Sequence, residues 1–307
     1  MTKITKDTTL AEILELATAE KILAKYNLPC LSCPFAKLEM DNLKIGQVCK
    51  TYDINLKDLL NELNEKVKKM KALLRIKNLR VKANSKEILK GINLEIMPGQ
   101  VQALLGPNGS GKSVLGQTIL GNPKYKVIQG NIFFKGKEIT KFFPEKRAKF
   151  GMALVWQSPP TIKGVKLSEL LKKISKKAKN RYLSFSKGLL EREVNVDFSG
   201  GEKKISELLQ ILALEPKFVI FDEIDSGLDI KRLQIVAKII KKELIQKKVS
   251  ILLITHLGQI LHYLKPSLTN VMVGGKIICK EKNFKKVLRI IKKYGYEKCK
   301  KCKLLAD

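Results

Sequence analysis

The chain has 307 residues, of which 44% are hydrophobic and 6% aromatic, and it carries 60 lysine and arginine residues against 29 aspartate and glutamate residues. This length predicts two domains, or one large domain with an appendage, and the apolar content is enough for a sizeable core. Because no apolar run approaches the length of a membrane span and residues 1–7 lack the apolar region of a signal peptide, we expect a cytoplasmic protein.

The formal net charge of +31 would attract polyanions, including nucleic acid, anionic lipid or an acidic protein. The lysines are spread along the whole chain and are not gathered in one tail, which favours a generally lysine-rich surface. A nucleic-acid interface needs a basic face with stacking aromatic residues or a reading motif, and the sequence offers neither pattern. The sequence therefore disfavours a nucleic-acid partner.

Residues 1–66 are predicted to form a small helical domain, followed by a basic linker at residues 67–72. Thr9 and Glu12 have the spacing of a capping box ahead of an apolar stripe. Asn55 has the character of a second helix start, because leucines follow it at helical spacing.

The pattern changes at residue 73, where a second domain is predicted to begin. Leu74–Ile76 and Ile92–Ile96 alternate apolar and polar residues, which is typical of half-buried antiparallel strands. Val101–Leu105, Phe218–Phe221 and Ile251–Ile254 are continuous apolar runs, which favour parallel strands covered on both faces. The fold class is therefore α/β.

Three further segments complete the prediction. Residues 161–197 carry leucines at helical spacing and predict a helical insertion. Residues 271–278 read as a hairpin that turns at Gly274 and Gly275. Residues 284–307 are expected to form a C-terminal helix and a tail.

A glycine-rich loop follows the apolar run that ends at Leu105, and a helical segment follows the loop. The loop fits G-x-x-x-x-G-K-[ST], in which backbone N–H groups wrap a phosphate chain at a helix N-terminus. We expect Lys112 to reach the β- and γ-phosphates of ATP and Ser113 to ligate Mg²⁺. The residues expected to bind nucleotide here are Gly106, Pro107, Asn108, Gly109, Ser110, Gly111, Lys112, Ser113 and Val114.

Three further polar residues come directly after apolar runs. Asp222 and Glu223 end the second run, where Asp222 can hold Mg²⁺ and Glu223 can polarise an attacking water. His256 follows the third run, which we expect to lie beside the strand before the glycine-rich loop. His256 is therefore predicted to reach a γ-phosphate.

Together with these residues, further motifs resemble the ABC ATPase family over residues 73–283. Phe198–Glu202 resembles the family's signature motif, Gln157 its Q-loop glutamine and Ser226–Asp229 its D-loop. The resemblance implies an ABC-type ATPase head with a mixed-sheet core, an antiparallel β subdomain and a helical insertion. One departure is that Val81–Ser85 offers no aromatic ring for stacking on adenine.

The family resemblance also implies a mechanism. Two heads would close head to tail, so that each ATP lies between one glycine-rich loop and the partner head's Ser199, Gly200 and Gly201. Asp229 of the D-loop is a further residue expected to bind nucleotide. The residues to which the resemblance assigns catalytic roles are Lys112, Gln157, Glu223 and His256, with Gln157 also a ligand of Mg²⁺.

A closer resemblance is to the SufC subfamily, the ATPases of Suf iron–sulfur cluster assembly. It rests on Gln157–Pro160, Phe198–Lys204 and Asp222–Asp229, with Glu202 and Asp225 as subfamily features. It implies that ATP-driven closure rearranges a SufB/SufD-like scaffold. The alternatives are a nucleotide-binding subunit of a membrane transporter, which would share every catalytic residue, and a nucleic-acid-linked ABC protein, which only the charge suggests.

The first 65 residues resemble the hybrid-cluster-protein-associated redox disulfide domain, through Tyr26–Pro34 and Tyr52–Asn55. Cys30 and Cys33 have the C-x-x-C spacing of a redox pair, and they could instead ligate zinc or a nascent iron–sulfur cluster, with Cys49 as a third thiolate.

The tail holds a second C-x-x-C pair, Cys299 and Cys302, whose neighbouring lysines favour the thiolate. Two such pairs can together supply four thiolates to a zinc or cluster site. Nothing in the sequence brings the two pairs together in space, so redox use, metal binding and no role all stay open.

Overall fold

The computed structural model describes residues 4–14, 19–28, 40, 42–69, 72–156, 159–175 and 188–296. By its internal contacts the chain divides into two compact units, Met1–Ala72 with Met97–Gly99 and Leu73–Ile96 with Gln100–Asp307. No helix in the described part of the chain is long and apolar enough to cross a bilayer.

The described part of the first unit is helical, with α1 (Leu10–Leu14), α2 (Ala19–Lys25), α4 (Ile45–Thr51) and α5 (Leu56–Lys69). The predicted capping box is confirmed, because Thr9 and Glu12 exchange two hydrogen bonds of 3.2 Å. Asn55 Oδ1 accepts from two backbone N–H groups of α5, at 3.1 and 3.3 Å, which confirms the second helix start. Helix α5 runs to Lys69, so the first residues of the predicted linker are helical.

Apolar residues from each of these helices form the core of the first unit. Ile13, Leu23, Ile45 and Leu59 are all fully buried. Cys49 on α4 is 2% exposed within the same core, and burial raises the pKa of its thiol. A buried thiol with a raised pKa is a poor nucleophile and a poor metal ligand at neutral pH.

The second unit contains a four-stranded antiparallel sheet in the order β2-β1-β4-β5. Its strands are β1 (Leu74–Ala83), β2 (Lys86–Ile96), β4 (Lys126–Phe134) and β5 (Lys137–Glu138). Leu74 pairs with Ile96 on one side and with Phe134 on the other, and all three are buried. The antiparallel β subdomain expected from the alternating pattern is therefore present.

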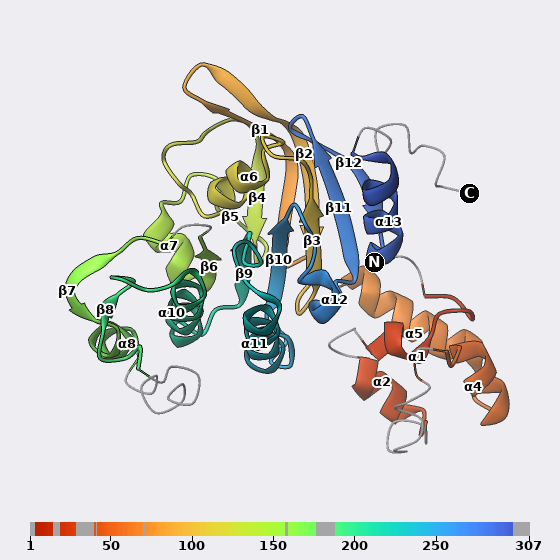
Figure 1. Cartoon of the computed structure of the whole chain (residues 1–307). Helices are drawn as coiled ribbons and strands as arrows, with labels where there is room; N and C mark the ends of the chain where they lie inside the picture. Colours follow the sequence, from red (N-terminus) through yellow and green to blue (C-terminus); the bar gives the residue numbers. More distant parts are fainter. Residues whose placement is uncertain are drawn as a thin grey trace. The chain divides into compact units, whose positions relative to one another are not determined.

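A six-stranded sheet forms the centre of the second unit, in the order β12-β11-β3-β10-β9-β6 (Figure 1). Its strands are β3 (Val101–Leu105), β6 (Met152–Val155), β9 (Phe218–Asp222), β10 (Ser250–Thr255), β11 (Leu268–Val273) and β12 (Lys276–Glu281). Strands β6, β9, β10, β3 and β11 run parallel, and β12 pairs antiparallel with β11 as the predicted hairpin. The parallel strands all end at one edge, where ligands of such sheets bind.

Helix α6 (Lys112–Ile119) packs against β2 of the first sheet and against β9 and β10 of the second. The other helices of this unit are α7 (Pro144–Lys149), α8 (Leu167–Ile174), α10 (Gly200–Ala213), α11 (Ile230–Ile240), α12 (Leu261–Leu264) and α13 (Phe284–Tyr294). A π-helical turn, Lys241–Ile245, continues α11. Residues of α8, α10, α11 and α13 share one core with the central strands.

The predicted helical insertion differs in detail. Among its described residues it opens with a strand, β7 (Ile162–Lys166), which pairs antiparallel with β8 (Glu193–Val194). Only α8 is helical in the described part of 161–197. The leucine spacing predicted that helix, whereas the ribbon depends on pairing between residues about 30 positions apart, which helical periodicity does not encode.

Candidate functional site

The glycine-rich loop leaves the end of β3 and leads directly into α6. Gly106 has no room for a side chain, because a Cβ atom would lie 2.2 Å from the backbone oxygen of Met272 on β11. Gly111 is the N-cap of α6 with φ 101°, a conformation that favours glycine. Neighbouring strands therefore set the shape of the loop, which leads into the N-terminus of α6, where free backbone N–H groups favour an anion.

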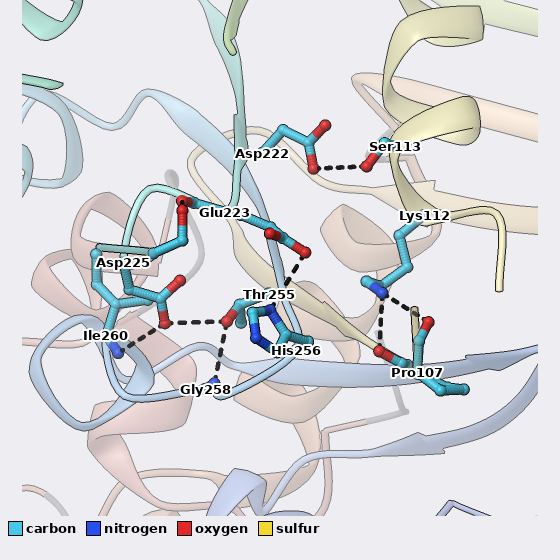
Figure 2. Close-up of polar contacts among 12 residues, drawn as sticks. Pro107, Lys112, Ser113, Asp222, Glu223, Asp225, Thr255, His256, Gly258 and Ile260 are labelled. Carbon is cyan, nitrogen blue, oxygen red and sulfur yellow. Dashed lines mark hydrogen bonds and ion pairs between the residues drawn. The ribbon is translucent and has the colours of Figure 1, made fainter. Parts of the chain in front are cut away.

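Lys112, the first residue of α6, is buried against its own loop. Its ammonium group donates to the backbone oxygens of Gly106 at 2.8 Å and Pro107 at 2.9 Å (Figure 2). Burial lowers the pKa of Lys112, and the nearby carboxylates of Glu223 and Asp222 partly offset that effect. The lysine is thus held at the mouth of the loop, where a phosphate would meet it.

Ser113 and Asp222 meet across the gap between α6 and β9. The Ser113 hydroxyl donates to Asp222 Oδ1 at 3.0 Å. Burial raises the pKa of Asp222, while the hydrogen bond from Ser113 works in the opposite direction. A hydroxyl and a carboxylate are the hard oxygen donors that Mg²⁺ prefers, so this pair fits that ion.

Glu223 has an unusual backbone, with φ 53°, although it is not glycine. Its N–H group donates to the backbone oxygen of Ile254 at 2.8 Å, and its carbonyl accepts from Ser226 at 3.0 Å. This turn directs the two neighbouring carboxylates differently, Asp222 toward Ser113 and Glu223 toward His256 (Figure 2). Strained residues of this kind cluster at functional sites.

Glu223 and His256 contact each other at the ends of β9 and β10. Glu223 Oε1 lies 3.2 Å from His256 Nδ1, and the glutamate is buried while the histidine is partly exposed. The prediction that the strand before His256 lies beside β3 is confirmed, because β10 pairs with both β3 and β9.

A polar network under this pair was not predicted. Asp225 Oδ2 accepts from the Thr255 hydroxyl at 2.9 Å, and Thr255 Oγ1 accepts from the Gly258 N–H at 3.0 Å. Burial raises the pKa of Asp225. The network ties the loop that carries Glu223 to the loop that carries His256.

The signature residues begin α10. Ser199 is the N-cap and forms a capping box with Glu202, whose carboxylate accepts from the Ser199 N–H at 2.8 Å. Arg192 lies 3.4 Å from the same carboxylate. Gly201 packs against Arg232, where a Cβ atom would lie 2.6 Å from the arginine side chain. Glu202 therefore stabilises the start of α10.

Asp229 is the N-cap of α11, where its carboxylate accepts from the Arg232 N–H at 2.9 Å. A cavity lies over the glycine-rich loop, and its described lining does not include Asp229, Ser199, Gly200 or Gly201. Within one chain the structure therefore does not bring the signature and D-loop residues to the cavity.

Sequence reasoning also missed two buried ionisable residues on α10, Lys204 and Glu207. Glu207 Oε1 accepts from the Trp156 N–H at 2.6 Å, and Lys204 donates to the Trp156 carbonyl at 2.9 Å. Burial raises the pKa of Glu207 to about 7 and lowers that of Lys204. The i, i+3 spacing of the two residues was the available signal. Both side chains thus bind the backbone of Trp156, the residue before Gln157. Gln157 lies outside the described residues.

A cavity of about 610 Å³ lies over the glycine-rich loop. This volume is in the ordinary range for a small-molecule site. Its described lining contains no aromatic residue and consists of Lys86, Glu87, Ile88, Lys90, Asn108, Gly109, Gly111, Lys112, Ser113, Val114, Glu223, Gly274 and Gly275. Residues of β2 and the turn of the β11–β12 hairpin therefore line the cavity beside the loop, and the Gly275 N–H donates to the Ser110 carbonyl at 3.0 Å.

The expected cysteine sites are outside the described part of the chain, because Cys30, Cys33, Cys299 and Cys302 all fall there. Within the described residues, no group of three or more histidine, cysteine, aspartate or glutamate side chains is placed to hold a metal ion. The described residues thus give no support to a zinc or iron–sulfur site.

Comparison with known proteins gives a consistent family. A family model described as ABC transporter matches residues 89–226. A probable ABC transporter ATP-binding protein of Streptococcus pyogenes serotype M3 is 41% identical over 225 residues, which cover 67% of this chain and 88% of that protein. Vegetative protein 296 of Bacillus subtilis is 40% identical over 223 residues, and the probable ATP-dependent transporter ycf16 of Trieres chinensis is 40% identical over 227 residues. These alignments cover 67% of this chain and 85% and 90% of the two relatives.

Solved structures agree on the fold. A nucleotide-free ATP-binding cassette from an ABC transporter superposes with a TM-score of 0.65 at 23% identity, covering 75% of this chain and 98% of the other. A structure of the ADP conformation of an ATP-binding cassette of an ABC transporter gives a TM-score of 0.64 at 24% identity, with the same coverage. At this identity the likeness shows a shared fold, with the mixed sheet and antiparallel subdomain described above.

Proposed function

The chain belongs to the family of ABC transporter ATP-binding proteins, which hydrolyse ATP, and on that premise we propose that it powers iron–sulfur cluster assembly on a SufB/SufD-like scaffold. Support for the ATPase step is the convergence of Lys112, Ser113, Asp222, Glu223 and His256 at one edge of the central sheet. Support for the assembly role is the sequence of the signature and of the segment after β9, including Glu202 and Asp225.

The loop and Lys112 bind the phosphates of ATP in this proposal. The amide groups at the start of α6 face the phosphate chain, and Lys112 exchanges its carbonyl acceptors at Gly106 and Pro107 for phosphate oxygens. Ser113 and Asp222 would hold Mg²⁺, which would neutralise charge that develops on the phosphates.

Glu223 is the general base that takes a proton from the attacking water, and His256 fixes its carboxylate. The strained turn at Glu223 keeps that carboxylate apart from Asp222, so one acid serves the metal and the other serves the water. Gln157 is the remaining proposed ligand of Mg²⁺ and lies next to Trp156, whose backbone Glu207 and Lys204 hold.

The partner head supplies the other half of each ATP site. The Ser199 hydroxyl accepts from Glu202 N, so its own hydrogen remains available to a γ-phosphate oxygen. The N-terminus of α10, with Gly200 and Gly201, adds donors and a favourable dipole, and Asp229 completes the contact. ATP binds the closed dimer more tightly than the open dimer, so ATP binding favours closure, and closure rearranges the attached scaffold.

The test of the site is Glu223→Gln, which keeps the shape of the side chain and removes its basicity. We expect the variant to retain ATP and to accumulate as a closed dimer, while turnover falls by about two to four orders of magnitude. Glu215→Gln, at an exposed position, is the matched control and should behave as wild type. Normal turnover by Glu223→Gln would remove Glu223 as the base.

The second candidate function is that of a nucleotide-binding subunit of a membrane transporter, which the names of the relatives favour. Affinity purification of the tagged Glu223→Gln chain with ATP, from detergent-solubilised cells, separates the two. A soluble SufB/SufD-like scaffold supports cluster assembly, and an integral membrane permease supports transport.

The cysteine pairs Cys30–Cys33 and Cys299–Cys302 are proposed as redox groups or as ligands of zinc or an iron–sulfur cluster, on residues 1–66 and 284–307 respectively. Metal analysis and visible absorption of anaerobically purified protein test the ligand role. Protein that contains no metal and takes none up would remove the ligand role, and thiol titration under oxidising and reducing conditions would then distinguish a redox role from no role.

A further inference from the structure

The end of the C-terminal helix reaches the backbone of the catalytic histidine. Helix α13 ends at Tyr294, and Gly295 turns the chain with φ 69°. The phenol of Tyr296 then donates a 3.0 Å hydrogen bond to the backbone oxygen of His256, 40 positions earlier. This contact joins the C-terminal segment to the loop after β10.

Helix α13 also packs against that loop. Gly258 is buried with φ 70°, and a Cβ atom there would lie 2.7 Å from the side chain of Leu288 on α13. On its other side the same loop is held by Asp225, through Thr255 and the Ile260 N–H. The segment that carries His256 is thus fixed from two directions by residues distant in sequence.

We propose that Tyr296 is a positioning residue for ATP hydrolysis, which acts by holding the His256 peptide so that the imidazole contacts Glu223. The inference rests on the proposed ATPase site. The contact between Nδ1 and Oε1 is 3.2 Å, at the long end of hydrogen-bond distances, so a shift of the His256 backbone by a few tenths of an ångström removes it. Small misplacements of catalytic groups are costly in rate.

The role belongs to the hydroxyl and not to the ring. The Tyr296 ring is partly buried and packs on the main core of the second unit, and phenylalanine would keep that packing. Neither Tyr296 nor His256 is among the described residues that line the nucleotide cavity. Loss of the hydroxyl should therefore affect the hydrolysis step and leave nucleotide binding unchanged.

The test is steady-state ATP hydrolysis by full-length Tyr296→Phe, with Tyr294→Phe as a matched control, because Tyr294 is 46% exposed at the end of the same helix. We expect Tyr296→Phe to lower kcat by about three- to tenfold, the range for loss of one hydrogen bond, with KM for MgATP unchanged. Tyr294→Phe should match wild type. An unchanged kcat, or an equal loss in both variants, would overturn the proposal.

A double-mutant cycle separates positioning from general stability. In a His256→Ala background, Tyr296→Phe should cause no further loss of residual kcat, because the group it positions is gone. A second loss of the same size would show that Tyr296 acts elsewhere and would refute the inference. If wild type itself does not hydrolyse ATP and Glu223→Gln does not trap it, the proposed function fails instead, so the two failures are distinguishable.

Discussion

Arg147 offers the sharpest test of how the nucleotide-binding helix is held. It is 2% exposed on α7, and its guanidinium donates four hydrogen bonds, all to backbone oxygens. Two acceptors, Thr118 and Ile119, are in the last turn of α6, where carbonyls lack helical partners and the dipole is negative. The other two are Phe142 and Thr140, at 2.8 Å each.

The contribution of Arg147 to the free energy of unfolding is the difference between two opposing effects. Four hydrogen bonds from a charged donor are worth about 1.5 kcal/mol each, or about 6 kcal/mol together. Burial lowers the pKa of Arg147 to about 10, which corresponds to a desolvation cost of about 3 kcal/mol. The net contribution is therefore about 3 kcal/mol, which Arg147→Met should remove while it fills much the same volume.

For a unit of this size, a loss of about 3 kcal/mol lowers the melting temperature by about 6–12 °C. Calorimetry of full-length protein measures this, and limited proteolysis reports which unit opens. Arg147→Lys should lose most of the same stability, because one ammonium cannot reach four carbonyls. Lys149→Met, at an exposed position on the same helix, is the control. Equal melting temperatures for Arg147→Met and Lys149→Met would refute the reasoning.

Two further predictions concern the hairpin and α10. Gly275→Ala places a Cβ atom 2.0 Å from the Ile88 oxygen at φ 80°. We therefore expect the free energy of unfolding to fall by about 1–3 kcal/mol and calorimetry to show weaker nucleotide binding. Gly274→Ala, where a Cβ atom meets nothing within 4 Å, is the control and should cost less stability. The Glu207 pKa of about 7 in the folded chain exceeds its ordinary 4.5, so its proton is retained on folding and the free energy of unfolding falls as pH rises from 4.5 to 7. In Glu207→Gln, the free energy of unfolding measured by urea titration should fall by about 1–3 kcal/mol less over this pH range than in wild type. An equal fall in both proteins would contradict the assignment.

Much of the architecture follows from local sequence patterns. The glycine-rich loop, the capping box at Thr9 and the hairpin turn at Gly274 each occupy a few consecutive residues, and their conformation follows from those residues alone. The strand ends that bring Glu223 and His256 together were predictable because apolar runs identify parallel strands, and such strands end at a common edge.

The residues that sequence reasoning missed all act over long separations. Arg147 caps a helix 28 and 29 positions away, Glu207 binds a backbone N–H 51 positions away, and Tyr296 reaches across 40. Each looks like an ordinary surface residue in sequence, since nothing local marks an arginine, a glutamate or a tyrosine as buried. Such contacts depend on the packing of whole elements, which periodicity does not encode.

This division between local and distant contacts has a functional consequence. The segment proposed to bind phosphate, from Gly106 to Ser113, is shaped largely by its own loop and the adjacent strands. The pair proposed to activate water, Glu223 and His256, depends instead on Asp225 and the C-terminal segment. Perturbation of the distant contacts should therefore separate nucleotide binding from hydrolysis, leaving a chain that binds ATP but turns it over slowly. A protein that performs work between binding and hydrolysis needs these two steps to be independently adjustable.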